Sequence, residues 1–186
     1  MKIGIIIGSV RDEQKGAAVG EWVLRHAEAK GGADFELVHL KDFELPVYSS
    51  ATLPMMAGRS YDSEAVTAWS QKIDSLDGYL FVTPEYNHSV PGGFKNAVDS
   101  LGPEWVGKAT GLIGYGAVGG VRAVEQWRLI LANFSQSVVR GAVDLNLFVD
   151  FADGQVVDSD PKIASVEGMI DEVLTALERS TVGASA

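Results

Sequence analysis

Short apolar runs without polar alternation recur along this chain and alternate with segments of helical spacing. Each run is rich in β-branched, aromatic and aliphatic residues, as strands buried on both faces are. The five runs are Lys2 to Ile7, Phe35 to Leu40, Tyr79 to Val82, Lys108 to Ile113 and Val143 to Phe148. Strands that alternate with helices pair in parallel through right-handed crossovers. The pattern therefore predicts an α/β fold with three layers, in which a doubly wound, five-stranded parallel sheet has the strand order 2-1-3-4-5.

The chain has 186 residues, which suits one domain, and it shows no internal repeat. We expect residues 1–179 to form a single domain and the small, polar residues 180–186 to fray. The apolar stretch at the start is too short for a signal peptide, and no window is long enough to span a membrane. The sequence therefore predicts a cytoplasmic protein that does not act at a membrane.

The composition argues against several classes of function. The net charge is −10 at pH 7, which makes nucleic acid a poor partner. The chain has no cysteine, so it has no disulfide, thiolate metal site or cysteine nucleophile. We find no histidine or carboxylate spacing typical of a metal site and no Gly-x-Ser-x-Gly elbow of a hydrolase. Any redox chemistry must therefore belong to a bound cofactor.

Three loops should meet at one edge of the predicted sheet. In the order 2-1-3-4-5, the loops after strands one, three and four lie together, and ligands bind at such carboxyl ends of strands. These loops are Gly8 to Gly16, Pro84 to Pro91 and Gly114 to Gly120. Pro84 cannot donate a ladder hydrogen bond, so we expect the chain to leave the sheet there. The stretch Thr83 to Asn96 is where we look for chemistry.

The first loop offers a hydroxyl, a guanidinium, an amide and an ammonium group just before a helix N-terminus, from Ser9, Arg11, Gln14 and Lys15. Unpaired backbone N–H groups and the helix dipole favour an anion at this position, and an arginine can add a bidentate contact. The inventory fits one phosphate group. A solvated loop is the alternative, because the acidic pair Asp12-Glu13 lies within it.

The third loop matches the pattern G-x-G-x-x-G through Gly114, Gly116 and Gly119. That fingerprint belongs to the first strand-to-helix turn of a dinucleotide-binding fold. Here it follows the fourth strand. We therefore interpret it as backbone that approaches a flat ring, and not as a pyrophosphate site.

Three sets of residues resemble the NADPH-dependent FMN reductase family, which includes bacterial quinone, azo-dye and chromate reductases. They are Gly8-Ser9-x-Arg11, the stretch Thr83-Pro84-Glu85-Tyr86-Asn87-His88-Ser89-Val90-Pro91-Gly92 with Lys95-Asn96, and Gly116-x-x-Gly119-Gly120-x-Arg122-Ala123. The resemblance covers roughly residues 3–135, and its most specific part is the Pro84-Glu85-Tyr86-Asn87 loop. It implies a flavodoxin-like fold, non-covalent FMN, and NADPH or NADH as co-substrate.

By position, the resemblance implies that the FMN phosphate is held by Ser9, Arg11, Gln14, Lys15 and Gly16. It implies that the ribityl chain and the isoalloxazine ring are lined by Pro84, Glu85, Tyr86 and Asn87, with Gly114 and Gly116 closing the other side. Two positions depart from the family pattern: Gln14 stands where relatives often have serine or arginine, and Gly114 where serine is common. We assign no catalytic side chain, because the flavin carries the chemistry.

Two alternatives to a reductase remain open at this point, a one-electron carrier of the flavodoxin type and a flavin-binding regulator without turnover. The acceptor of a reductase would be a quinone, an azo compound, a free flavin or a similar small molecule. Apolar residues of the Leu45 to Gly58 connection and of Phe94 to Trp105 exceed what a monomer readily buries. With the resemblance, this predicts a homodimer or a dimer of dimers.

Overall fold

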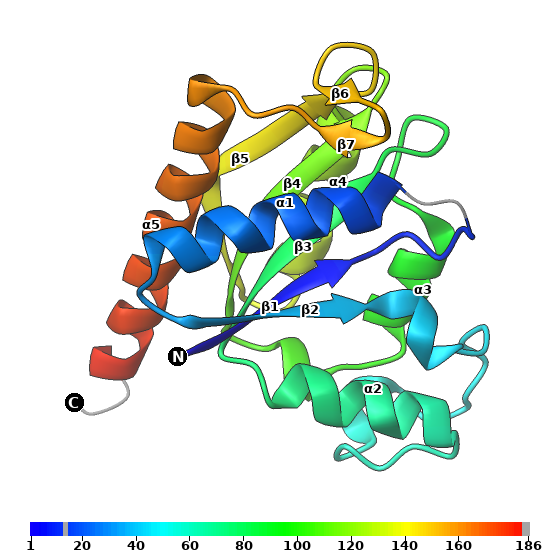
Figure 1. The fold of residues 1–186 in the computed structure, drawn as a ribbon. Helices are drawn as coiled ribbons and strands as arrows, with labels where there is room; N and C mark the ends of the chain where they lie inside the picture. Colours follow the sequence, from blue (N-terminus) through cyan, green and yellow to red (C-terminus); the bar gives the residue numbers. More distant parts are fainter. Residues whose placement is uncertain (13–14, 184–186) are drawn as a thin grey trace.

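The computed structural model describes residues 1–12 and 15–183. Its main sheet is parallel and has the order β2-β1-β3-β4-β5, so the predicted topology is confirmed (Figure 1). The strands are β1 (Lys2–Ile7), β2 (Asp34–His39), β3 (Gly78–Pro84), β4 (Ala109–Gly116) and β5 (Ser137–Asn146). The helices are α1 (Lys15–Lys30), α2 (Glu64–Asp74), α3 (Gly92–Asp99), α4 (Val121–Ala132) and α5 (Asp160–Gly183).

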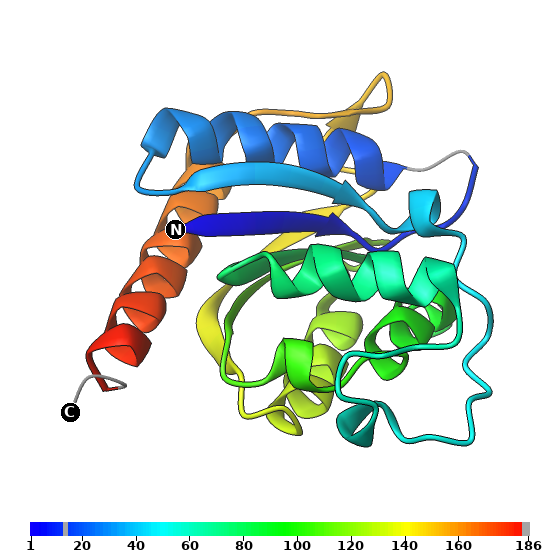
Figure 2. The same ribbon diagram turned by 90° about the horizontal axis from the view of Figure 1, so that it is seen from below.

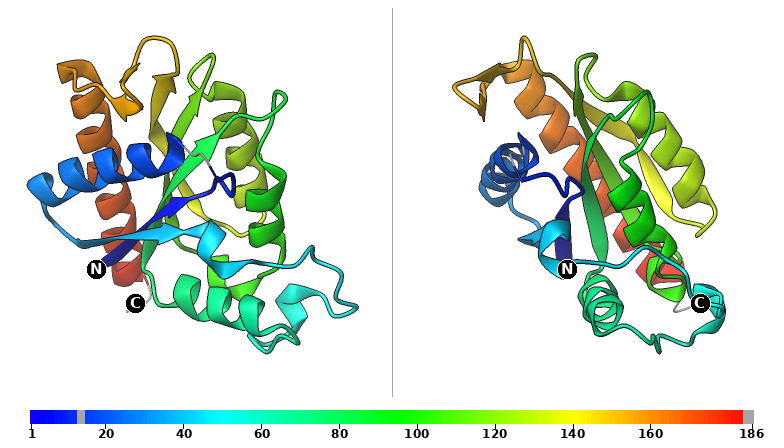
Figure 3. Two further views of the ribbon diagram at one scale, coloured as in Figure 1. Left: turned by 45° about the vertical axis from the view of Figure 1, so that its right-hand side comes forward. Right: turned by 90° about the vertical axis from the view of Figure 1, so that its right-hand side faces the viewer.

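Helices cover both faces of the sheet and make three layers (Figure 3). Side chains of α1 and α5 pack with one face, and side chains of α2, α3 and α4 pack with the other. Neighbouring strand residues alternate between the two cores, since Leu80 and Val82 belong to the first and Tyr79 and Phe81 to the second. A strand buried on both faces has no solvent-facing position, which is why its sequence shows no polar alternation.

Strands β3 and β4 extend further than predicted. The chain leaves the sheet at Pro84 as expected, but the strand does not end at Val82: Thr83 and Pro84 belong to β3, and Pro84 pairs with Tyr115 of β4. The N–H group of Glu85 donates to the Tyr115 carbonyl, so the nitrogen of Pro84 faces the β1 side, where β1 has already ended at Ile7. Gly114, Tyr115 and Gly116 likewise belong to β4 and not to a loop. A residue without an N–H group is tolerated where the neighbouring strand has ended.

The last strand and the segments beside it also differ from the prediction. β5 begins at Ser137 and ends at Asn146, and Phe148 beyond it is 80% exposed. An antiparallel hairpin of β6 (Phe151–Ala152) and β7 (Gln155–Val156) follows, which the sequence pattern did not indicate. α5 runs to Gly183, into the segment for which fraying is expected, and residues 184–186 lie outside the described part. Among the described helices, none combines the length and hydropathy that a membrane crossing needs.

The long connection between β2 and α2 is fastened to the rest of the chain at several points. It lies on the same side of the sheet as α2 (Figure 2). The Asn96 side chain accepts from the Tyr48 N–H at 2.8 Å and donates to the Pro46 carbonyl at 2.8 Å. Farther along, the Tyr61 hydroxyl donates to the buried Glu104 carboxylate at 2.8 Å. The connection is therefore tied by hydrogen bonds to α3 and to the segment that follows it.

Two aromatic residues that we expected to contribute to an apolar surface lie in the core. Phe94 and Trp105 are both 0% exposed. They pack with Phe81, whose ring centroid is 4.6 Å from that of Phe94 and 5.9 Å from that of Trp105. This part of the sequence-based expectation is wrong, because short helical segments close to a sheet can bury large rings that their own length does not suggest.

Candidate functional site

The carboxyl ends of β1, β3 and β4 lie next to one another and bring the three predicted loops together. Ile7 of β1 pairs with Val82 of β3, and the Gly8 N–H donates to the Val82 carbonyl at 2.9 Å. On the other side, β3 pairs with β4 up to Pro84 and Tyr115. The loops that follow these strands therefore leave the sheet from adjacent positions.

A hydroxyl pair joins the first loop to the second. The Ser9 side chain lies 3.2 Å from the Tyr86 hydroxyl, although 77 positions separate the two residues. Ser9 is only 2% exposed, and its hydroxyl also accepts from the Arg11 N–H at 3.4 Å. Burial raises the pKa of the nearby Tyr115 phenol, so the Tyr115 hydroxyl stays neutral near pH 7. Ser9 and Tyr115 thus bring uncharged hydroxyl groups to the place where the first two loops meet.

The first loop carries positive charge that the described protein leaves available. No carboxylate among residues 1–12 and 15–183 pairs with the exposed Arg11 guanidinium. Asp12 pairs with Lys41 at 2.6 Å, and the hydrogen bond from Lys41 lowers the pKa of the Asp12 carboxyl. Lys15 at the start of α1 lies with its Nζ 5.1 Å from the centroid of the Phe151 ring. Gln14, another predicted phosphate contact, lies outside the described residues.

Asp12, one of the two acidic residues that favour a solvated loop, is exposed, and its charge is balanced by Lys41. The first turn of α1 as described contains no acidic residue. Such a helix start offers backbone N–H groups and the positive end of the dipole to an anion. The chemistry of these groups therefore fits one phosphate.

Gly16 lets α1 pass close to the sheet at this site. A Cβ at Gly16 would lie 2.8 Å from the Tyr115 hydroxyl and 3.1 Å from a methyl carbon of Ile7. A Cβ at Gly8 would collide with the Phe94 ring. Each glycine thus allows a contact between backbone and side chain that a larger residue would block.

The second loop begins with a tight two-residue turn. Tyr86 and Ser89 exchange backbone hydrogen bonds of 3.0 and 3.1 Å. Asn87 and His88 between them both have positive φ, 47° and 72°. Two positive φ values at the centre of a hairpin are typical of a type I′ turn, in which asparagine is well tolerated. The turn starts at Tyr86, whose hydroxyl contacts Ser9, and the chain then enters α3.

The Glu85 carboxylate joins the second loop to the third. It accepts the backbone N–H of Arg122 at 3.0 Å and the Arg122 Nη1 at 2.6 Å. Burial raises the pKa of the Glu85 carboxyl, but the hydrogen bonds and positive charge of Arg122 outweigh that effect, so the net pKa is lowered. Glu85 is therefore ionised near pH 7, and its charge is balanced within the protein.

The glycines of the third loop allow close packing of backbone on backbone. A Cβ at Gly114 would lie 2.8 Å from the Gly119 carbonyl oxygen and 2.9 Å from that of Gly120. The Gly119 N–H donates to the Gly116 carbonyl at 3.1 Å. Glycine at position 114 is therefore required by packing in this chain, where the family pattern suggested serine. Gly116 lies beside Glu85, whose Cβ would be 3.3 Å from a Cβ at position 116.

Two residues of this site received no role from the sequence alone. Arg122 belongs to a recognised motif, but nothing in the sequence indicates that it would pair with Glu85, 37 positions away. Tyr115 lies between two glycines in a stretch whose sequence predicts a loop, whereas it belongs to β4 and is 6% exposed. Its position in a strand became visible only when the register with β3 was known.

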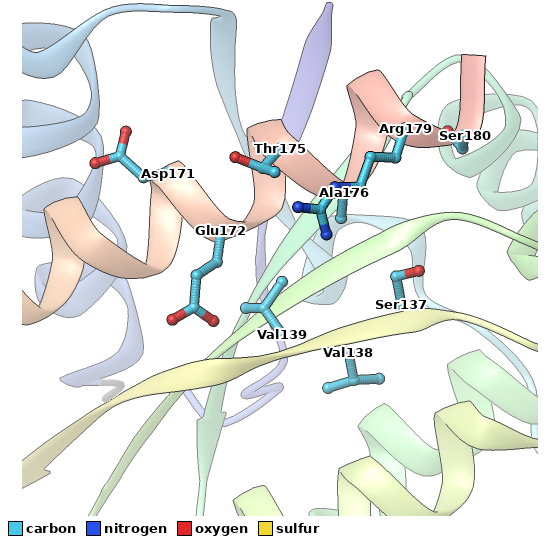
Figure 4. A pocket seen from close by; sticks show the side chains of 9 residues that line it. All are labelled: Ser137, Val138, Val139, Asp171, Glu172, Thr175, Ala176, Arg179 and Ser180. Carbon is cyan, nitrogen blue, oxygen red and sulfur yellow. The ribbon is translucent and has the colours of Figure 1, made fainter. Parts of the chain in front are cut away.

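Two cavities lie away from these loops. A cleft of about 720 Å³ separates α5 from the amino end of β5, with Ser137, Glu172 and Arg179 among the side chains around it (Figure 4). A second cavity of about 650 Å³ lies under the 46–63 connection. The first is at the opposite end of the sheet from the three loops, and its Glu172 already accepts the Gly141 N–H at 2.8 Å. Neither displaces the three-loop edge as the candidate site.

Comparison with known proteins identifies the family of this chain. Residues 1–149 match the model of the family described as NADPH-dependent FMN reductase. The chain is 35% identical to the NAD(P)H-dependent FMN reductase ntnL of Nectria sp, covering 95% of this chain and 94% of that protein. It is 34% identical to a 2-hydroxy-1,4-benzoquinone reductase of Burkholderia sp, over 71% of this chain and 70% of that protein.

A solved structure is similar as a whole. The flavoenzyme NAD(P)H:(acceptor) oxidoreductase FerB of Paracoccus denitrificans superposes with a TM-score of 0.70 at 25% identity, and the match covers 96% of this chain and 98% of that chain. The family match extends over the three loops and the strands that carry them. The fold, the juxtaposed loops and the matched residues together show that this chain belongs to the NADPH-dependent FMN reductase family.

Proposed function

We propose that this FMN-dependent NAD(P)H oxidoreductase delivers two electrons to a quinone. The overall reaction would convert NAD(P)H, one proton and a quinone into NAD(P)⁺ and a hydroquinone. Two named relatives support the acceptor class: the quinone reductases of Burkholderia sp and of Escherichia coli, the latter 40% identical over 50% of this chain. An azo compound and a free flavin are the other acceptors to be assayed. The proposal places the reaction in the cytoplasm, where its nicotinamide donor is available.

The observation that carries the proposal is the joining of three loops by two side-chain pairs, Ser9 with Tyr86 and Glu85 with Arg122. The three loops bring together hydroxyl groups, backbone and an exposed arginine without a described carboxylate partner, which suits a flat ring with one phosphate. The residues that would hold the phosphate are Ser9, Arg11, Gln14, Lys15 and Gly16. The residues that would hold the ribityl chain and ring are Pro84, Glu85, Tyr86, Asn87, Gly114 and Gly116.

When bound, FMN supplies the redox chemistry, because its ring can take up two electrons from a nicotinamide and release them to an acceptor. The chain's own residues would orient the flavin and exclude water from it. The Glu85 carboxylate is paired with Arg122, and Tyr115 is a buried, neutral phenol. Neither is therefore a free acid or base near pH 7. His88 is exposed at the tip of a turn. No side chain is assigned a catalytic role, since a hydroquinone can take its protons from water.

The nicotinamide and the acceptor would use the same face of the ring in turn, which gives ping-pong kinetics. Steady-state rates measured over a grid of NADPH and quinone concentrations should give parallel double-reciprocal lines. The same assay with NADH tests the donor preference. Intersecting lines would require both substrates to bind together and would refute the ping-pong scheme. Slow or absent turnover of an FMN-loaded protein would favour a one-electron carrier or a regulator over a reductase.

We further propose that the protein is a homodimer or a dimer of dimers. Four apolar side chains of the connection before α2 are exposed: Val47 at 82%, Leu53 at 62%, Met55 at 54% and Met56 at 78%. A two-fold contact would bury the same patch on both chains. Phe94 and Trp105 do not contribute to this argument, because each is already buried in its own subunit.

A further inference from the structure

Helix α4 begins without a side-chain cap from its own chain segment. The residue before it, Gly120, has φ of 72° and no side chain. The first backbone N–H groups of a helix have no partner within the helix and require one from elsewhere. For Arg122, that partner is an oxygen of Glu85, which reaches α4 from the end of β3. Glu85, in the second loop, thus caps α4, the helix that follows the third loop.

The Arg122 guanidinium occupies the other oxygen of the same carboxylate. Nη1 donates to Oε1 at 2.6 Å, while the backbone N–H donates to Oε2 at 3.0 Å. The Glu85 side chain is 9% exposed and that of Arg122 is 42% exposed, so the acid is the enclosed partner. Such charge-assisted bonds are short and hold their partners in one geometry. One residue therefore fixes both oxygens of Glu85.

The backbone around Glu85 is fixed by further contacts. Its N–H donates to the Tyr115 carbonyl at 3.1 Å. The next residue, Tyr86, begins the tight turn and meets Ser9 through its hydroxyl. Any movement of Glu85 would therefore be passed directly to Tyr86 and Asn87, two of the residues proposed to line the ribityl chain and the ring.

We infer that Arg122 is a positioning residue for the flavin ring, because it holds the Glu85 carboxylate against the start of α4 and thereby fixes the backbone of Glu85, Tyr86 and Asn87. This role rests on the proposed function. Arg122 acts through Glu85 and belongs to the first turn of α4, after the third loop, whereas the proposed phosphate contacts belong to the first loop and the start of α1. Loss of the Arg122 side chain should weaken the binding of the flavin ring and leave the binding of the phosphate unchanged.

The test measures the dissociation constants of FMN and riboflavin from the quenching of flavin fluorescence on the full chain stripped of flavin. Arg122→Ala should raise both constants by the same factor, about tenfold, as expected from the loss of one charge-assisted interaction. Arg122→Lys, which keeps the backbone cap and the charge, should recover part of that loss. Arg140→Ala is the matched control, since it removes the same charge from an exposed position on β5.

A double-mutant cycle with Glu85→Ala separates positioning through Glu85 from a direct effect of Arg122. In the Glu85→Ala background, Arg122→Ala should change both constants by less than about twofold. The visible absorption band of bound FMN should also shift in Arg122→Ala as water reaches the ring, and it should return toward the wild-type band in Arg122→Lys. Circular dichroism of each variant shows whether it is folded.

Three results would overturn the inference. One is binding of both flavins by Arg122→Ala with the affinity of the Arg140→Ala control. Another is a loss confined to FMN, which would place Arg122 at the phosphate. The third is a double variant in which the effects of Glu85→Ala and Arg122→Ala on the dissociation constants multiply, as they do for independent sites. If Arg122→Ala does not fold, the Arg122→Lys and Glu85→Ala variants decide by the same criteria. Wild-type protein that binds no FMN would refute the proposed function instead, whatever the variants do.

Discussion

The hydroxyl groups of Ser9 and Tyr86 lie 3.2 Å apart and connect the end of β1 to the turn after β3. Ser9 is almost fully enclosed, whereas Tyr86 is half-buried at the entrance to the turn. The pair fixes how far the first two loops stand from each other. In the proposed site, that separation decides whether the phosphate contacts and the ring contacts suit one FMN molecule.

Replacing Tyr86 by phenylalanine should weaken FMN binding several-fold, because it removes one hydrogen bond worth about 1 kcal/mol between the two loops and leaves the ring in place. Fluorescence titration measures the change. Tyr48→Phe is the control, since the Tyr48 hydroxyl donates to the Thr52 carbonyl within the exposed connection. Equal effects of the two substitutions would show that the Ser9 contact has no special part in binding.

Replacing Arg11 by alanine should weaken FMN far more than riboflavin, by about tenfold or more for FMN, because a guanidinium–phosphate contact is charge-assisted and riboflavin has no phosphate. The titration used for Arg122 provides the measurement. The two arginines should thus give opposite patterns, with the FMN-to-riboflavin ratio changed by Arg11→Ala and unchanged by Arg122→Ala. Equal weakening of both ligands by Arg11→Ala would remove the phosphate assignment from the first loop.

Replacing Gly114 by serine should destabilise the fold by about 1–3 kcal/mol, the usual cost of overpacking, since its Cβ would meet two backbone carbonyl oxygens. Thermal or urea unfolding of the flavin-free protein measures it. The control is Gly168→Ser, at an exposed position of α5 where a Cβ meets nothing within 4 Å. Stability equal to wild type in Gly114→Ser would mean that the third loop can move to admit a side chain.

The contribution of Glu85 to folding stability should depend on pH in the acid range. Its pKa is lowered in the folded protein, because the bonds from Arg122 outweigh the effect of burial, and His88 adds a smaller lowering. A group with a lowered pKa stabilises the fold above its ordinary pKa and loses that contribution as pH falls through the folded-state value. The stability difference between wild type and Glu85→Gln should therefore shrink as pH falls below the ordinary glutamate range. Urea unfolding at a series of pH values tests this, and a constant difference would contradict it.

Replacing Met56 by glutamate should shift the protein toward monomer and lower NADPH oxidation, because the charge would lie in the proposed contact between subunits. Light scattering at micromolar concentration measures the shift. Leu129→Glu is the control, since Leu129 is 71% exposed on α4, away from the connection. A monomeric wild type with full activity would refute the dimer. Trp105 is unsuitable for this test, because a charge there would enter the core.

The sequence by itself determined the sheet, its order and the family. Runs such as Tyr79 to Val82 predict strands buried on both faces because both sides of each strand pack on helices. The loop beginning at Pro84 is specific enough to identify the family from residues alone. These features are local, since they depend on residue type and spacing within one short segment.

Only the tertiary structure decided which side chains meet. Glu85 with Arg122 and Ser9 with Tyr86 are contacts across 37 and 77 positions, and no local pattern encodes them. The same holds for Trp105, which the sequence placed on a surface and the packing of α2, α3 and β3 buries. The strand continues through Pro84 because β1 has ended beside it, a fact about the neighbouring strand. Such outcomes depend on register and on the space between elements, which a single sequence does not specify.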